Sequence, residues 1–492
     1  MTHLTIVLLE RIIFMVISSC RTRVLKGAFM NRVSPRRLTS HRLHAVATGV
    51  ALTALLTSCQ QAASPPDVIE TLATFTVNST SDAHDANPGN GRCETAPGNG
   101  VCTLRAAIEE ANARTAYPTD IITLPAGSYK LTLGELVIQD SLYLHGASSR
   151  STVIDGDNRS RVLVIQKVSA DPTVHISKVK VQKGSGGSFQ NGGGMFVSSG
   201  SYLFLSNSVV TNNKGSQFGG GISNAGYLQL FRTRVSNNSV PLGAGGGQTA
   251  SGGGIFSFAS GITKIERSTI SGNEATRGGG IRNGGGRLEV VNSTISGNRA
   301  VTRGGGIMSH GITVISSSTI TNNQANLSGY GTSSEVSFGG GIYNTGTVSI
   351  GKTILAGNLD NRSSFDSNYA PDCYSKATPE LPSVYMTSHR SNLVGVVNGN
   401  CNFRDSIWGD PVFDFVGTAS APLNARLSPL GGYGGGTPTH ALLSGSPAID
   451  KATSGTSASF FDRPSKDQRG KTRPRDGDGN GSAQCDIGSF ER

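Results

Sequence analysis

The chain has 492 residues, of which 36% are hydrophobic and 66 are glycine, and its formal net charge is +11. This length exceeds an ordinary single core, and so much glycine favours a repeat fold over a globular one. The charge does not indicate a nucleic-acid partner, because residues 1–58 hold eight of the 43 Lys and Arg but one of the 32 acids.

The start of the chain has the features of an export signal. Four arginines lie between Arg32 and Arg42, residues 45–56 form an apolar stretch too short to span a membrane, and the segment Leu56-Thr57-Ser58-Cys59 follows. We therefore predict that residues 1–58 are a signal region. The basic segment begins just after Met30, which makes Met30 an alternative start of the chain.

The segment that ends at Cys59 resembles the lipobox of bacterial lipoproteins. This resemblance implies that Cys59 is lipidated and becomes the first mature residue, that residues 59–74 are a tether, and that Gln60 directs the protein to the outer membrane or cell surface. Ile17-Ser18-Ser19-Cys20 is a weaker lipobox, because charged residues interrupt its apolar stretch. An ordinary cleavable signal is the alternative.

Internal repetition dominates the middle of the chain. A glycine triplet is followed six times by an apolar residue, namely Met195, Ile222, Ile255, Ile281, Ile307 and Ile342. An asparagine follows each triplet, at Asn213, Asn238, Asn273, Asn298, Asn323 and Asn358. Their intervals are 25, 35, 25, 25 and 35 residues. The period is 25 residues, with insertions around 241–250 and 326–337 that we interpret as loops.

Within a repeat, apolar residues alternate with polar ones, as at Leu288 and Val290, which predicts strands. The residue before each repeated asparagine is Asn or Gly, the types that best tolerate a left-handed backbone at a tight corner. Such strands cannot bury an apolar face alone, so residues 131–370 should coil into an all-β, right-handed parallel β-helix.

The repeated asparagines and glycine triplets have structural explanations. Every repeat has an asparagine, whereas a binding site needs asymmetry, so we predict a hydrogen-bonded stack at equivalent corners. None of the triplets is followed by the Lys-Ser/Thr of a phosphate-binding loop. We interpret them as corners where Cβ atoms would collide.

Residues 75–130 are predicted to form an N-terminal cap. Leu104, Ala107, Ile108 and Ala111 recur at helical spacing and predict one short helix whose apolar face covers the open end of the coil. In an oxidising compartment the expected disulfides are Cys93 with Cys102 and Cys373 with Cys401, which leaves Cys485 unpaired once Cys59 is lipidated.

Both ends of the chain resemble bacterial surface proteins. Cys102-Thr103-Leu104-Arg105-Ala106-Ala107 resembles the CSLREA motif, with Thr103 and Ala106 as departures that leave an N-cap but no capping box. Residues 371–492 resemble the choice-of-anchor Q domain in eight blocks, which start at Asp372, Ser391, Cys401, Asp410, Thr437, Ser446, Asp467 and Cys485. This resemblance implies a surface location and a pectin-lyase-like β-helix, but no reaction. Because no hydrophobic tail precedes Arg492, the expected anchor is the N-terminal lipid.

Catalysis is the rival hypothesis. Parallel β-helices of the pectin-lyase-like kind include pectate lyases and polygalacturonases, whose chemistry needs clustered carboxylates or a poised arginine. Residues 172–359 contain no aspartate, and their glutamates do not recur at one position of the repeat. We therefore predict no catalytic residues, with a polysaccharide lyase or glycoside hydrolase as the alternative and a structural envelope protein as a further one.

One metal site is a candidate. Asp476, Asp478 and Asn480 place side-chain oxygens at alternate positions before Gly481, as in the first half of a calcium loop. The twelfth position is Ile487 and not glutamate, so a solvated acidic turn is the alternative. Calcium is the only cofactor considered.

These observations predict a lipid-anchored surface protein whose rod presents a contact surface. The expected partners are an extracellular polysaccharide or a surface protein, and the membrane through the lipid, but not nucleic acid. The two loop insertions are the expected place of contact.

Overall fold

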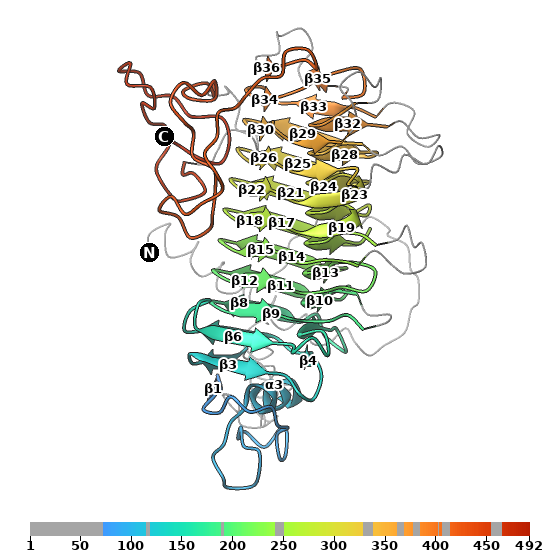
Figure 1. The fold of residues 1–492 in the computed structure, drawn as a ribbon. Helices are drawn as coiled ribbons and strands as arrows, with labels where there is room; N and C mark the ends of the chain where they lie inside the picture. The colour runs from blue at the N-terminus through green and yellow to red at the C-terminus, as the bar shows by residue number, and fades with distance from the viewer. Residues whose placement is uncertain are drawn as a thin grey trace, which may run out of the picture. The chain divides into compact units, whose positions relative to one another are not determined.

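The computed structural model describes residues 72–114, 119–187, 191–241, 250–327, 338–361, 369–376, 384–401, 403–405, 414–453 and 465–492. The predicted signal region, Cys59 and all but the ends of the two insertions (241–250 and 326–337) lie outside these residues. Residues 70–492 form one compact unit. Its described part is a right-handed parallel β-helix, as predicted (Figure 1).

Sheet A has twelve described strands, each paired in parallel with the next. In spatial order they are β1 (Thr74–Thr76), β2 (Asp120–Leu124), β5 (Leu142–Gly146), β8 (Thr173–Ser177), β11 (Tyr202–Ser206), β14 (Tyr227–Phe231), β17 (Ile262–Glu266), β21 (Arg287–Val291), β25 (Ile312–Ser316), β29 (Thr347–Gly351), β33 (Met386–Ser388) and β35 (Phe403–Asp405).

Sheet B follows sheet A in each coil and has eleven described strands. In spatial order they are β3 (Gly127–Lys130), β6 (Thr152–Asp155), β9 (Lys180–Gln182), β12 (Val209–Thr211), β15 (Arg234–Ser236), β18 (Thr269–Ser271), β22 (Thr294–Ser296), β26 (Thr319–Thr321), β30 (Ile354–Leu355), β34 (Leu393–Val394) and β36 (Phe415–Val416).

Sheet C completes each coil, and its described strands directly follow the glycine triplets in the repeats. They are β4 (Leu136–Ile138), β7 (Leu163–Ile165), β10 (Met195–Val197), β13 (Ile222–Asn224), β16 (Ile255–Ser257), β20 (Ile281–Asn283), β24 (Ile307–Ser309), β28 (Ile342–Asn344) and β32 (Cys373–Ser375). A short sheet D lies between sheets B and C in four coils and contains β19 (Glu274–Arg277), β23 (Arg299–Arg303), β27 (Gln324–Ala325) and β31 (Leu359–Asp360).

The coil is longer than the sequence predicts. After the first strand, β1, its successive strands run from Asp120, inside the predicted cap (75–130), to Val416, inside the predicted C-terminal region (371–492). The bounds 131–370 were too narrow because the terminal coils lack the glycine triplet and the repeated asparagine that mark the central ones. Their strands are recognisable only by their parallel pairing with neighbouring coils.

Alternation along each strand builds the core. In β21, Leu288 and Val290 are fully buried while Arg287 and Glu289 point outward. Equivalent residues stack from coil to coil into one continuous cluster that extends from Phe75 to Cys401. Each fully buried Leu or Ile contributes about 1.5–3 kcal/mol of hydrophobic free energy. The interior columns therefore hold the coils together.

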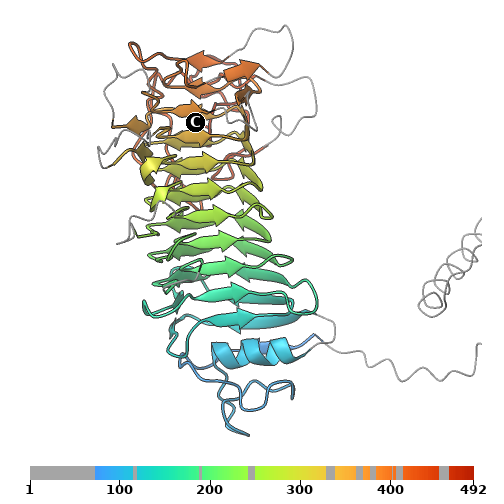
Figure 2. The same cartoon turned by 90° about the vertical axis from the view of Figure 1, so that its right-hand side faces the viewer.

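The predicted helix is present as α3 (Leu104–Ala113), which lies across the N-terminal end of the coil (Figure 2). Thr103 is its N-cap, and its side chain accepts a hydrogen bond from the Ala106 backbone N–H at 3.1 Å. Leu104, Ala107 and Ile108 are buried and belong to the main core. The helix therefore covers apolar side chains that the first coil would otherwise expose.

The repeated asparagines form the predicted stack. Asn298 shows the pattern, since its Nδ2 donates to Asn323 Oδ1 at 2.9 Å and to Ile270 O at 2.9 Å. Its own Oδ1 accepts both the backbone N–H and the side-chain Nδ2 of Asn273. The stack ends at Asp372, whose Oδ1 accepts the corresponding two bonds from Asn358. A carboxylate suits the last position because it accepts without having to donate.

The glycine triplets are corners, as expected. A Cβ on Gly194 would lie 2.6 Å from the Gly221 carbonyl oxygen of the next coil, and a Cβ on Gly221 would lie 2.7 Å from that of Gly254. Backbone atoms cannot yield to such contacts, so only glycine fits. The residues before the repeated asparagines have the expected left-handed backbone, with φ of 55° at both Asn212 and Asn237.

The structure joins Cys93 to Cys102 and Cys373 to Cys401, the two pairs expected from the sequence, and Cys485 lies outside both disulfides. Among the described residues, no helix has the length and hydrophobicity needed to cross a membrane.

The asparagine stack gives a stability prediction. Asn298→Ala leaves the buried donors of Asn273 and the Ile270 carbonyl without partners and should lower the free energy of unfolding by about 3 kcal/mol. Arg299→Ala changes an exposed neighbour and should have little effect. Denaturant unfolding of both variants checks this, and equal stability of the two would refute a structural role for the stack.

Candidate functional site

The C-terminal segment, meaning described residues 417–453 and 465–492, returns along the outer face of sheet B (red in Figure 1). Three stacked threonines of sheet B, Thr269, Thr294 and Thr319, receive it. Gln468 bonds to the first two, at 3.0 Å to Thr269 Oγ1 and 2.6 Å from Thr294 Oγ1. Ser489 Oγ donates to Thr319 Oγ1 at 3.0 Å. A buried polar contact thus fixes the segment on β18, β22 and β26.

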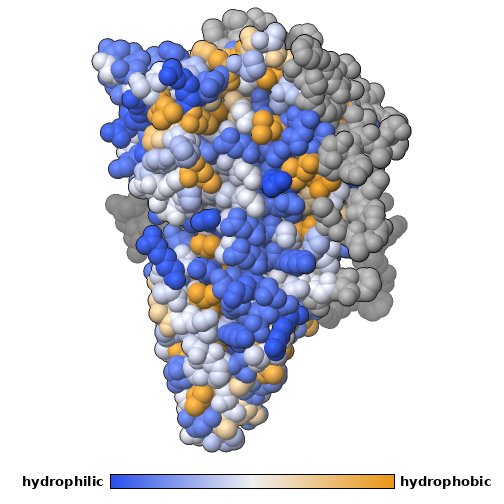
Figure 3. All heavy atoms as spheres, viewed as in Figure 1, coloured by the Kyte–Doolittle hydropathy of each residue, from blue (hydrophilic) through white to orange (hydrophobic). Residues whose placement is uncertain are grey.

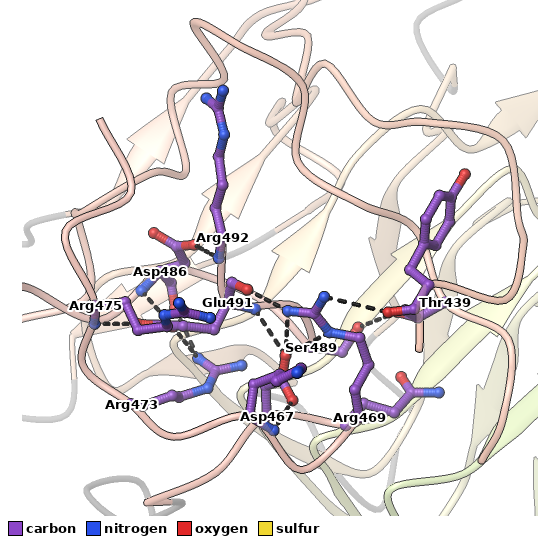
Figure 4. Close-up of polar contacts among 12 residues, drawn as sticks. Thr439, Asp467, Arg469, Arg473, Arg475, Asp486, Ser489, Glu491 and Arg492 are labelled. Atoms are coloured by element: carbon purple, nitrogen blue, oxygen red, sulfur yellow. Dashed lines mark hydrogen bonds and ion pairs between the residues drawn. The ribbon is translucent and has the colours of Figure 1, made fainter. Parts of the chain in front are cut away.

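Charged groups organise the segment itself (Figure 4). Buried Asp467 pairs with Arg469 at 2.8 Å and accepts the backbone N–H of Glu491 at 3.1 Å. The Arg473 guanidinium donates to the carbonyls of Asp486 and Gly488 at 2.9 and 2.7 Å. This segment has few strand-to-strand backbone hydrogen bonds. Hydrogen bonds from charged side chains to its backbone stabilise it instead.

The outward residues of sheet B change from threonine to arginine, valine and lysine below the docked C-terminal segment. Thr269 of β18 is in register with Arg234 of β15, which is in register with Val209 of β12, and Val209 with Lys180 of β9. Two coils below the docked segment, those of Lys180 and Arg234, therefore carry basic side chains at the position where higher coils carry threonine. In this one column, the threonines bind the C-terminal segment, whereas the lysine and the arginine present positive charge to a groove.

A groove of about 740 Å³ lies between these uncovered coils and the C-terminal segment. One side consists of the corner and the strands of sheet B, and the other contains Gly432, Gly435 and Gly436. All charged residues in its lining are basic: Arg150, Lys178, Lys180, Arg232 and Arg234. Figure 3 shows hydrophilic side chains gathered over this part of the coil. We call this site the basic groove.

Two features indicate that the positive charge of the basic groove is uncompensated. Within the described residues, none of its five basic side chains forms an ion pair. The Arg234 Nε is buried and lacks a hydrogen-bond partner among the described atoms. A buried donor without a partner costs about 1–3 kcal/mol, which an acceptor supplied by a ligand would recover.

The corner between sheets A and B has a backbone that basic residues rarely adopt. Lys178, Arg232 and Arg267 have φ of 59°, 48° and 51°, the left-handed region, whereas Asn207 and Asn292 occupy it in neighbouring coils. Asn enters this region readily, but other non-glycine residues lose about 1–2 kcal/mol there. The chain thus accepts backbone strain at positions that place cations on this corner.

Arg267 occupies the next corner of the same column and is buried there beneath the C-terminal segment. Its Nε donates to Gln468 O at 3.2 Å, and Thr437 Oγ1 donates to Arg267 O at 3.0 Å. Burial lowers the pKa of Arg267, and the positive charge of Arg232 lowers it further. A Cβ on Gly470 would contact both guanidinium groups, so the side chains of Arg232 and Arg267 approach the same glycine.

The predicted metal residues lie in one turn. Asp476 and Asp478 lie beside buried Asp450, with carboxylate oxygens of the three within 4.8 Å of one another. Asn480 adjoins them, since its Nδ2 donates to Asp478 Oδ2 at 2.9 Å. Asp476 accepts backbone N–H groups of its own turn, which lower its pKa. Ile487 is fully buried. Calcium binding stays a prediction that a titration with calcium would test.

The basic groove was not foreseen from the sequence. The overall charge balance outside the signal region hid it, and all but the ends of the insertions expected to form the contact surface lie outside the described residues. A usable signal existed. Lysine or arginine stands six residues before three of the repeated asparagines, as Arg232, Arg267 and Lys352, and this position is at the corner of a coil.

Comparison with known proteins adds little beyond the fold. No family model matches the chain, and no curated protein matches its sequence, so the resemblance to the CSLREA and choice-of-anchor Q families stays a prediction. A crystal structure of the pectate lyase Pel9A is similar at 14% identity and a TM-score of 0.36, over 86% of this chain and 97% of that one. A mannuronic-acid-specific polysaccharide family 6 lyase from human gut microbiota is similar at 11% identity and a TM-score of 0.20, over 62% and 89%. Likeness at this level supports no conclusion about activity.

Burial of Glu491 predicts a pH dependence. Burial raises the pKa of Glu491 to about 7, although nearby Arg473 opposes the shift. Because the folded protein holds this proton more tightly than the unfolded chain, the associated stability is complete below about pH 4.5 and is lost as the pH rises through about 7. The loss should be about 1–3 kcal/mol.

Urea unfolding of the protein and of Glu491→Gln between about pH 5 and pH 8 measures this effect. The variant, which cannot ionise at this position, should show a flatter dependence on pH than the unmodified protein. Identical slopes would show that the Glu491 carboxyl does not titrate in this range.

Proposed function

We propose that this protein is an exported, lipid-anchored surface protein whose β-helix binds an acidic polysaccharide in the basic groove. The observation that carries the proposal is the set of five basic side chains in one groove, without a described acidic residue in its lining. Three further properties support a polysaccharide: the polarity of the lining, the rigidity of the strands and the lack of a described catalytic pair.

The lining matches the hydrogen-bonding needs of a sugar chain. Between the cations lie short hydroxyl and amide side chains, namely Ser148, Ser149, Asn207, Ser208, Thr211 and Ser236. Such groups both donate and accept, as sugar hydroxyls do. A protein partner would instead favour an apolar centre with aromatic anchors, which the described lining lacks. The basic groove therefore suits a polyanion rich in hydroxyl groups.

Binding without cleavage fits this lining better than glycoside hydrolysis does. Hydrolysis of a glycosidic bond requires a pair of carboxyl groups at the scissile bond. The described residues that line the basic groove include no Asp or Glu. A lyase or hydrolase remains the second candidate function, and assaying binding and chain cleavage on the same polysaccharides separates the two.

Surface location is the other half of the proposal. The basic segment, the apolar stretch and the lipobox-like end at Cys59 occur in the order that an exported lipoprotein requires. The resemblance to the CSLREA and choice-of-anchor Q families supports the same location. A tethered rod would expose the basic groove to polysaccharides of the surroundings.

Charge reversal tests the binding site. Lys180→Glu with Arg234→Glu should lower affinity for a uronic-acid polysaccharide at least tenfold, because two attractions become repulsions at low dielectric. Arg92→Glu with Lys376→Glu makes the same change at exposed residues outside the basic groove and should lower it much less. Calorimetric titration at about 0.05 and 0.15 M salt should also show weaker binding at higher salt. Equal losses in the two double variants would remove the basic groove as the binding site.

Replacement of Cys59 tests the anchor. Cys59→Ser removes the thiol that is proposed to carry the lipid, so the protein should move from the membrane to the soluble fraction on cell fractionation. Persistence of this variant in the membrane fraction after a detergent-free wash would contradict the lipoprotein assignment.

A further inference from the structure

In the sheet B column of the basic groove, two basic positions flank a neutral one, whereas Arg150 lies outside this column in the turn before β6. Along one outward column of sheet B, parallel pairing places Val153, Lys180, Val209 and Arg234 in register on four successive coils. The side chains therefore alternate between neutral and basic. The next residue of the column is Thr269, which the C-terminal segment covers.

The adjoining corner repeats this alternation. Lys178 and Arg232 stand at the corners of the coils that contain β9 and β15, and neutral Asn207 stands at the corner of the coil between them. Each basic coil thus contributes two cations, and the coil between them contributes none to the groove lining. Over these three coils the two columns follow one pattern; the next corner residue, Arg267, is basic but is buried beneath the C-terminal segment.

Parallel stacking sets the spacing of these charges. Neighbouring strands are about 4.8 Å apart, so the two basic coils are separated by about 10 Å along the coil axis. The strands and corners that carry them belong to the hydrogen-bonded coil and not to a free loop. The spacing is therefore built into the backbone before a ligand arrives.

Some cationic groups on the two basic coils also lack a hydrogen-bond partner or lie near another cation. Arg234 has a buried Nε without a partner among the described atoms, and the guanidinium groups of Arg232 and Arg267 approach the same glycine, Gly470. The intermediate coil offers Asn207, whose exposed amide can bond to a neutral hydroxyl. Along the coil axis, one pair of cations is thus followed by a hydroxyl-binding group and then by a second pair of cations.

We infer that the basic groove selects a linear polysaccharide that lies parallel to the coil axis and presents one anionic group to it for every two sugar residues. This inference rests on the proposed function and adds orientation and charge spacing to it. In an extended chain with nearly two-fold symmetry, alternate residues turn the same side toward the protein. Uronic-acid polymers have this property, whereas a chain with a charge facing the protein at every residue would set an anion against the neutral coil.

A charge-swap variant tests the spacing without altering the total charge. Val209→Arg with Arg234→Val moves one cation to the middle coil, so that it neighbours Lys180 directly. Its affinity for a hexasaccharide of a homopolymeric uronic acid, measured by calorimetry, should fall at least tenfold. A second swap, Lys180→Val with Val209→Lys, brings the other cation next to Arg234 and should have the same effect. Circular dichroism and thermal unfolding confirm that each variant is folded.

The outcomes separate this inference from the proposed function. If the unmodified protein binds the hexasaccharide and both folded swaps bind it within twofold of the same affinity, the spacing has no role and the inference is wrong. If the unmodified protein binds no uronic-acid or sulfated polysaccharide, the proposed function itself fails. Loss of affinity in both swaps, with no comparable loss in Arg92→Glu plus Lys376→Glu, supports the inference.

Discussion

Stacking of each coil on the next at about 4.8 Å is the constraint from which the other features follow. Parallel pairing in fixed register places equivalent residues directly above one another. Any residue type that recurs in the repeat becomes a continuous column. Isoleucine after the glycine triplet becomes core, asparagine becomes a hydrogen-bonded stack, and glycine becomes a corner through which backbones approach closely.

A column of stacked residues leaves unsatisfied groups at its two ends. Interior coils satisfy each other, but the last asparagine needs an acceptor and the first coil needs an apolar cover. Asp372 supplies the acceptor, and its complete burial raises its pKa to about 7. Helix α3 supplies the cover. The irregular parts of the chain thus occur where repetition ends, and each completes a set of bonds that the repeat leaves open.

The basic groove arises where the regular and irregular parts meet. The coil provides evenly spaced positions on a rigid backbone, and the C-terminal segment provides the facing side of the groove. Thr269, Thr294 and Thr319 bind that segment, while Lys180 and Arg234 of the same column remain uncovered. A few substitutions within one column therefore decide between intramolecular docking and a surface available to a ligand.

The sequence by itself determined the central coils, because their period, strand alternation, asparagine stack and glycine corners are local and repeated, and it also predicted the capping helix from the spacing of Leu104 and Ile108. It underestimated the length of the coil, whose end strands are defined by pairing and not by motif. Only the tertiary structure revealed the basic groove. Arg232 and Gly436 are about 200 residues apart in the chain but line the same groove. Lys180 and Arg234 also line it together only because the chain makes two turns of the coil between them. Such sites depend on distances in space that no local pattern records.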